Sequence, residues 1–122
     1  MSKRRIPDRG YVYWIDPKPT QGREMQGQHR FVVITPRAIN GLGVAMAVPI
    51  TTGGYVTRTS GLAVVIQGHD TTGVAVCNQV RSFDIEERVR LGTARYVETL
   101  DVAVMDEIVL RVLSVIDPEV DD

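Results

Sequence analysis

The segment Tyr11–Ile15, with the sequence YVYWI, consists entirely of aromatic and β-branched residues and follows Gly10. This composition directly after a glycine is typical of a β-strand. Similar short apolar runs recur along the chain, each ending near a proline, a glycine or a polar turn. We therefore predict further strands at residues 31–35, 44–50, 62–66 and 74–77, with residues 81–84 extending or following the last of them.

The C-terminal part of the chain has a different period. Apolar residues recur every four positions from Leu100 to Val112, which indicates one amphipathic helix. We place it between about Thr99 and Ile116, because Pro118 disfavours a helical conformation in the residue before it. Several short strands and one terminal helix predict a mainly β (α+β) fold, built from a small, strongly curved antiparallel sheet or barrel with a C-terminal α-helix.

Length and composition fit one domain over residues 1–122, with residues 1–8 and 118–122 expected to be flexible ends. No apolar run approaches the roughly 18 residues of a membrane span, and no apolar stretch follows the basic start as in a secretory signal. Cys77 is the only cysteine, so no intrachain disulfide forms. These features favour a cytoplasmic protein. Because Cys77 lies in an apolar run, a buried inert thiol is favoured over a catalytic Cys–His pair.

Charge is divided unevenly along the chain. Residues 1–97 carry 13 Lys and Arg against seven Asp and Glu, whereas residues 98–122 carry one against eight. A basic body with an acidic end is able to present a positive face to a polyanion. The alternative is a solvated surface with an acidic tail.

Residues 22–30, with the sequence GREMQGQHR, concentrate reactive side chains in a long loop. Arg23 and Arg30 are suited to clamping a phosphate, and Glu24 or His29 to accepting a proton from a ribose 2′-hydroxyl. A charged surface loop is the alternative. Residues 49–55, PITTGGY, offer hydroxyls and glycine amides to a phosphate, or form an ordinary turn. No metal-ligand motif is present, and we expect no cofactor.

These segments, in this order, resemble the MazF/Kid (PemK) family of toxins over residues 9–116. Residues 9–14 resemble its opening glycine and apolar strand. Residues 19–31 follow its first-loop pattern DPTxGxEQxGxRP, with one extra residue before the arginine. Residues 49–54 match its PIT or PVT turn, residues 58–62 resemble the RTAGF stretch of Kid, and residues 73–84 resemble GV…DQVKSID.

The resemblance implies an SH3-like barrel with a C-terminal helix. It also implies a homodimeric toxin that cuts single-stranded RNA, including mRNA, at short sequences without a metal ion. Its partner would be a cognate antitoxin, with DNA contacted only through that antitoxin and no membrane involved. By position, Arg30 matches the arginine that stabilises the transition state, Thr51 the threonine that holds the scissile phosphate, and Glu24 the glutamate implicated in activity.

The chain departs from Kid at the histidine, arginine and aspartate of the Kid catalytic set, where it has Arg23, Val76 and Asn78. The general base is therefore either Glu24 or His29. We expect the RNA around the cut to contact Arg23, Thr52, Tyr55, Arg58, Asn78, Gln79 and Arg81. Two alternatives stay open. One is a CcdB-like gyrase poison, although that class ends in Trp-Gly-Ile and this chain does not. The other is a catalytically weak RNA-binding or regulatory relative.

Overall fold

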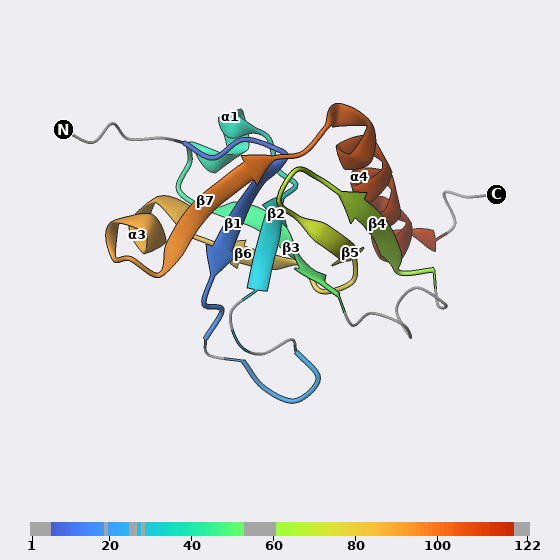
Figure 1. Cartoon of the computed structure of the whole chain (residues 1–122), viewed down its shortest axis with the longest axis horizontal. Helices are drawn as coiled ribbons and strands as arrows, with labels where there is room; N and C mark the ends of the chain where they lie inside the picture. The colour runs from blue at the N-terminus through green and yellow to red at the C-terminus, as the bar shows by residue number, and fades with distance from the viewer. Residues whose placement is uncertain (1–5, 19, 25–26, 28, 53–60, 119–122) are drawn as a thin grey trace.

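The structure is a computed structural model that describes residues 6–18, 20–24, 27, 29–52 and 61–118. Its strands are β1 (Tyr11–Ile15), β2 (His29–Val33), β3 (Ala45–Thr51), β4 (Ala63–Gln67), β5 (Thr72–Val76), β6 (Arg81–Phe83) and β7 (Ala94–Thr99). Its helices are α1 (Arg37–Asn40), α3 (Ile85–Arg90) and α4 (Val102–Ile116). The strands form the centre of the molecule, with α4 along one side and α3 at the opposite side (Figure 1).

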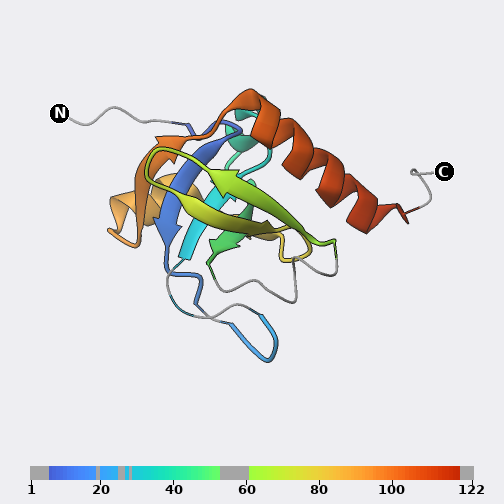
Figure 2. The same ribbon diagram turned by 45° about the vertical axis from the view of Figure 1, so that its right-hand side comes forward.

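All seven strands belong to one antiparallel sheet in the order β4-β5-β3-β2-β1-β7, with β6 also paired to β3. Strand β3 is long enough to pair with β6 through Ala45–Ala47 and with β5 through Ile50 and Thr51. The β4–β5 hairpin folds over the other strands (Figure 2). The predicted mainly β fold with a C-terminal helix is confirmed. The predicted barrel closure is not found, because within the described residues no ladder joins β4 to β7.

Side-chain alternation divides the core into two clusters. Val12 and Val32 face one cluster, which α4 covers with Met105, Ile108 and Val112. Tyr13, Phe31 and their neighbours face the second cluster, where Phe31 packs edge-to-face on Phe83 with ring centroids 5.0 Å apart. Strands β1, β2 and β3 therefore contribute buried residues to both clusters from their two faces, as a period of two requires.

Helix α4 follows the predicted four-residue period closely. Met105, Ile108 and Val112 are buried, whereas Ile116 at the end of the helix is 68% exposed. Further large apolar side chains on this helix are exposed, namely Val102, Leu110, Leu113 and Val115. No helix within the described part of the chain is long and apolar enough to cross a membrane.

The predicted strands differ from the observed ones by one or two residues at their ends, except for β1, whose bounds match. Two elements, α3 and β7, were not predicted. Strand β7 alternates short, charged and aromatic residues and lacks the apolar run that identified the others. Asp84 starts α3 by accepting a hydrogen bond from the Glu87 amide at 3.1 Å.

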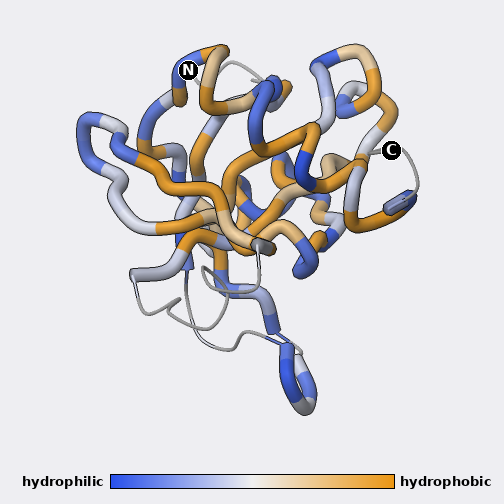
Figure 3. The backbone as a smooth tube through the Cα atoms, turned by 90° about the vertical axis from the view of Figure 1, so that its right-hand side faces the viewer, coloured by the Kyte–Doolittle hydropathy of each residue, from blue (hydrophilic) through white to orange (hydrophobic). Residues whose placement is uncertain are grey.

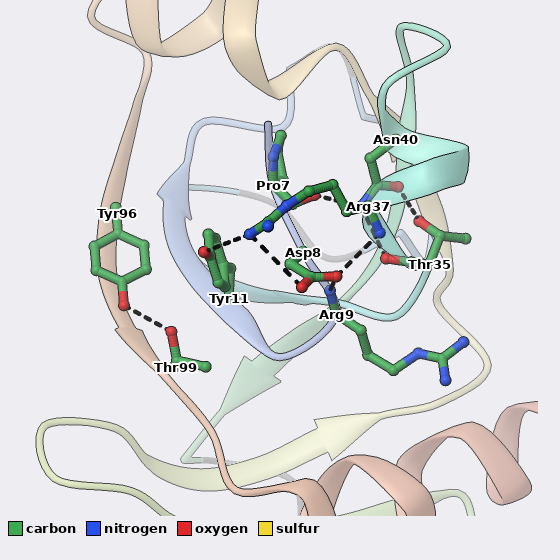
Figure 4. Close-up of polar contacts among 9 residues, drawn as sticks. All are labelled: Pro7, Asp8, Arg9, Tyr11, Thr35, Arg37, Asn40, Tyr96 and Thr99. Carbon is green, nitrogen blue, oxygen red and sulfur yellow. Dashed lines mark hydrogen bonds and ion pairs between the residues drawn. The ribbon is translucent and has the colours of Figure 1, made fainter. Parts of the chain in front are cut away.

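A polar cluster holds the segment before β1 against the turn that contains α1 (Figure 4). The buried Asn40 side chain donates to the carbonyl oxygens of Pro7 at 2.9 Å and Thr35 at 2.8 Å. Arg37 donates to the Tyr11 hydroxyl and forms an ion pair with Asp8. Residues 7 and 8 are thus held on the body, and residues 1–5 and 119–122 of the expected flexible ends lie outside the described residues.

Candidate active site

Arg30 and Thr51 lie at the same end of the sheet, where β2 begins and β3 ends. Arg30 pairs with Ile50 across these two strands. Because successive side chains of a strand point to opposite faces, the side chains of Thr51 and His29 project from the face of the sheet opposite to that of Arg30. A ligand that contacts both Arg30 and Thr51 therefore lies across the end of the sheet rather than over one face.

The guanidinium of Arg30 is held from two sides. It stacks over the indole of Trp14, its cross-strand partner on β1, with 5.2 Å from Cζ to the ring centroid. Its Nη1 donates to Thr71 Oγ1 at 2.9 Å and to the Asp70 carbonyl oxygen, both in the β4–β5 turn. Its Nε and Nη2 make no hydrogen bond to any residue that the structure describes. That edge of the guanidinium is available to an anion.

Glu98 on β7 organises the turn that holds Arg30. Its buried carboxylate accepts hydrogen bonds from the backbone amides of His69 at 2.8 Å and Asp70 at 2.9 Å. Burial by itself raises the pKa of Glu98, but bonds from the Thr71 hydroxyl and from nearby amides outweigh it, so the pKa lies below its usual 4.5. Asp70 donates its backbone amide to Glu98 and accepts from Arg30 through its carbonyl oxygen, while Thr71 Oγ1 accepts from Arg30 as well. A continuous line of contacts therefore runs from Glu98 to the guanidinium.

Glu98 also joins parts of the sheet that no ladder connects among the described residues. Strands β4 and β7 stand at the two ends of the strand order, and the Glu98 side chain spans from β7 to the β4–β5 turn. The approach is close, because a Cβ on Gly68 would lie 2.8 Å from Glu98 Oε1. A side chain at position 68 would displace either the turn or the carboxylate.

Thr51 occupies a similarly tight position. It pairs with Val74 on β5. A Cβ on Gly73, whose φ is 135°, would lie 2.6 Å from the Thr51 carbonyl oxygen. Only glycine adopts this backbone conformation readily and leaves room for the Thr51 backbone. The position of Thr51 therefore depends on the glycine that precedes Val74.

The loop after β1 extends beyond this end of the sheet and is largely hydrophilic (Figure 3). Its base is fixed by Arg88, whose Nη1 donates to the Asp16 carbonyl oxygen at 2.7 Å. Within the loop, Glu24 Oε1 accepts from the Gln21 amide at 2.8 Å. The Glu24 carboxylate thus closes a local turn of the loop and keeps its second oxygen exposed.

The structure brings only some of the predicted RNA-binding residues together. Gln79 Nε2 donates to the carbonyl oxygen of Arg23 at 3.3 Å, which joins the loop to the β5–β6 turn. Thr52 and Asn78 are exposed, and Arg81 lies on β6 with its guanidinium 5.2 Å from the Phe83 ring centroid. The remaining two, Tyr55 and Arg58, lie outside the described residues.

Three residues of this region were missed by sequence reasoning: Trp14, Thr71 and Glu98. Trp14 was assigned only to a strand, and Thr71 only to a polar turn. Glu98 could have been noticed only as a carboxylate within a strand, and that observation depends on recognising β7 from the sequence. Cys77 is buried as predicted, and burial raises the pKa of its thiol to about 11, so it stays protonated near neutral pH.

The chemistry available at this end of the sheet is that of anion binding and proton transfer. A preset guanidinium, a threonine hydroxyl, an exposed carboxylate and an imidazole surround it. Across the described ranges, no group of three or more His, Cys, Asp or Glu side chains is arranged to hold a metal ion.

Residues 8–116 match the family model described as PemK-like, MazF-like toxin of type II toxin-antitoxin system. The chain is 34% identical over 112 residues to the Endoribonuclease PemK of Escherichia coli, covering 89% of this chain and 81% of that protein. Its fold is similar to that of the crystal structure of MazF (Form-I) from Deinococcus radiodurans, with a TM-score of 0.76, 27% identity and coverage of 92% and 97%. A MazE-MazF crystal structure (Form-II) from the same organism matches with a TM-score of 0.69, 27% identity and coverage of 92% and 96%.

Replacing Glu98 by glutamine should destabilise the protein by about 2–3 kcal/mol at neutral pH, because amide N–H groups of the turn lose their anionic acceptor. The lowered pKa means that this carboxylate adds stability above pH 4.5, which is lost as the pH falls through the folded-state pKa. Urea unfolding of both proteins at pH 7 and below pH 4 measures the difference. The difference in unfolding free energy should become smaller in acid. A difference that is independent of pH would show that the charge of Glu98 does not stabilise the turn.

Proposed function

The chain belongs to the PemK-like, MazF-like toxin family of type II toxin-antitoxin systems. On that basis we propose how the end of the sheet that carries Arg30 and Thr51 cleaves RNA. It is a toxin endoribonuclease like the relatives that it matches. We propose that its substrate is single-stranded RNA, including mRNA, cut at a short sequence without a metal ion. It would act in the cytoplasm.

The observation that carries this proposal is the fixed position of Arg30. Its guanidinium is stacked on Trp14 and bonded through Nη1 to Thr71, yet it presents Nε and Nη2 outward. A donor that is held before the substrate binds stabilises developing charge without a cost of reorganisation at the moment of reaction. An RNA phosphate at the end of the sheet would meet such a donor.

The proposed reaction is an internal transfer at phosphorus. The ribose 2′-oxygen loses its proton to Glu24 or His29 and attacks the adjacent phosphorus. The bond from phosphorus to the 5′-oxygen breaks, and that oxygen gains a proton. The products are a 2′,3′-cyclic phosphate and a 5′-hydroxyl. Arg30 and Thr51 stabilise the charge on the phosphoryl oxygens, from the two faces of the sheet end.

The RNA around the cut would follow the polar side chains at this end of the sheet. The hydrogen bond between Gln79 and Arg23 joins the β1–β2 loop to the β5–β6 turn. This turn would form one side of the proposed RNA path. Thr52, Asn78 and Arg81 continue it. We retain Tyr55 as a stacking platform and Arg58 as a phosphate contact.

The proposed protein partners are inferred from the exposed apolar side chains of α4 and from the charge of the RNA path. The described part of α4 leaves Leu110, Leu113 and Ile116 at least 49% exposed, more apolar surface than a lone helix of a monomer usually presents. We propose that it contributes to a homodimer, and that a cognate antitoxin inhibits the toxin by placing an acidic segment in the RNA path. DNA would be contacted only through the antitoxin, and no membrane is involved.

Replacing Arg30 by alanine should slow RNA cleavage on the order of a hundred- to a thousandfold, the usual effect of losing one preorganised donor. Arg30→Lys should recover little, since a single ammonium cannot bond to Thr71 and grip a phosphate in two places. Cleavage rates of a fluorescent RNA measure both, with circular dichroism to show that each variant is folded. Arg37→Ala, at the opposite end of β1, is the matched control. An Arg30→Ala protein that cuts at the parent rate would refute the assignment.

The proton acceptor can be identified with two isosteric changes. Glu24→Gln keeps an oxygen that accepts from the Gln21 amide, so the loop turn survives while the base is lost. It should reduce the rate about a hundredfold or more, and more than His29→Gln does. Single-turnover rates at neutral pH provide the ranking. If His29→Gln is the slower enzyme, the role passes to His29.

The assembly is tested by mass. Light scattering at micromolar concentration should give about twice the chain mass of 13.5 kDa. Changing Leu110 and Leu113 together to glutamate should shift the protein towards the monomer, because charge at an apolar interface is costly. A parent protein that stays at the mass of one chain would rule out the dimer.

A further inference from the structure

Arg30 is one member of a row of side chains that crosses three strands. Trp14 on β1 pairs directly with Arg30 on β2 and with Arg95 on β7. Directly opposed residues of antiparallel strands project from the same face with Cβ atoms about 4.5–5.5 Å apart. Arg95, Trp14 and Arg30 therefore project side by side from one face of the sheet, with Trp14 between the two arginines.

The two arginines of this row differ in how they are held. Arg30 is bonded to Thr71 and stacked on the indole. The Arg95 side chain is exposed and has no hydrogen bond or ion pair to any described residue. Its positive charge, unpaired within the described residues and next to the partly exposed Trp14, is available to a ligand that carries negative charge.

A pocket of about 330 Å³ opens beside Trp14, between the end of β1 and the start of β7. Trp14, Asp16, Thr93 and Arg95 are among the residues that line it. The Asp16 amide donates to the Thr93 carbonyl oxygen at 3.2 Å, which fixes the strand ends at its base. The volume is at the lower end of the range of small-ligand sites, which suits one planar ring better than a larger group.

We propose that this pocket binds one nucleotide of the RNA next to the cleaved phosphate, with its base against Trp14 and its outer phosphate on Arg95. The inference rests on the proposed function, since Arg30 marks the cleaved phosphate. The row then contacts phosphate, base and phosphate in succession, the combination that binds single-stranded nucleic acid in general. The Asp16 carboxylate is the one acidic group of the lining, so the phosphate lies at the Arg95 side.

The single tryptophan of the chain gives a direct readout. Titrating the protein with an RNA that carries 2′-deoxyribose at the cut nucleotide allows binding without cleavage. Stacking of a base on Trp14 should quench the intrinsic fluorescence as the site fills. The same RNA, labelled, gives the dissociation constant by anisotropy over a series of salt concentrations.

Two variants separate the contacts. Arg95→Gln should weaken binding several-fold and reduce the slope of log K against log salt by about 0.7, the value for one phosphate contact of a single strand. Trp14→Leu should weaken binding on the order of ten- to a hundredfold with the slope unchanged. Arg37→Gln removes an equal charge at the other end of β1 and is the control for non-specific electrostatics.

The outcomes distinguish this inference from the proposed function. A parent protein that neither binds nor cuts RNA defeats both. If the parent cuts RNA but its fluorescence is unchanged on binding, and Arg95→Gln matches Arg37→Gln in affinity and slope, the toxin function stands and the pocket is not a nucleotide site. Should Trp14→Leu fail to fold, the fluorescence of the parent and the Arg95→Gln series still decide the question.

Discussion

The carboxylate of Glu98 is the interaction on which the geometry of this sheet end depends. It lies on β7, the last strand of the order, and accepts hydrogen bonds from the turn that follows β4, the first strand. A side chain thus fastens two strands that no described ladder joins. Its bonds keep it ionised despite burial, and an ionised acceptor makes stronger hydrogen bonds than a neutral one. The backbone of Asp70, bonded to both Glu98 and Arg30, then fixes the position of the Arg30 guanidinium.

In the proposed reaction, the groups that stabilise charge stand on strands, whereas the favoured proton acceptor stands on a loop. Arg30 and Thr51 belong to neighbouring strands, and their places depend on the turn at Thr71 and on the close approach of Gly73. Glu24 and Arg23 belong to the loop, whose base Arg88 fixes. Such a division would hold the charge-stabilising groups in place while the loop adjusts to the bound RNA.

The sequence predicted those features that depend on local pattern. Strand β1 was located correctly from its run of aromatic and β-branched residues, and helix α4 from apolar residues that repeat with the period of a helix. Strand β7 was not, because its half-exposed residues carry no apolar run, and α3 is too short for a period. For the same reason Glu98 and Thr71 were missed as residues that hold Arg30: the hydrogen bonds concerned join residues 28 to 41 positions apart, and single-sequence patterns carry no information about such distant pairs. Arg30 itself was singled out by the charged side chains of its loop, and the family resemblance then predicted its role.

The chemistry of the cut ends tests the central claim most directly. The measurement uses purified protein, a long RNA with paired and unpaired regions, and a buffer containing a chelator, followed by mapping of every new end. We expect cuts at a short shared sequence in unpaired regions, with 5′-hydroxyl ends and 2′,3′-cyclic phosphates, and no cut where the 2′-hydroxyl of the target nucleotide is replaced by hydrogen. Cleavage that leaves 5′-phosphates, survives loss of the 2′-hydroxyl or requires added Mg²⁺ would contradict a reaction driven by the 2′-oxygen and stabilised by Arg30.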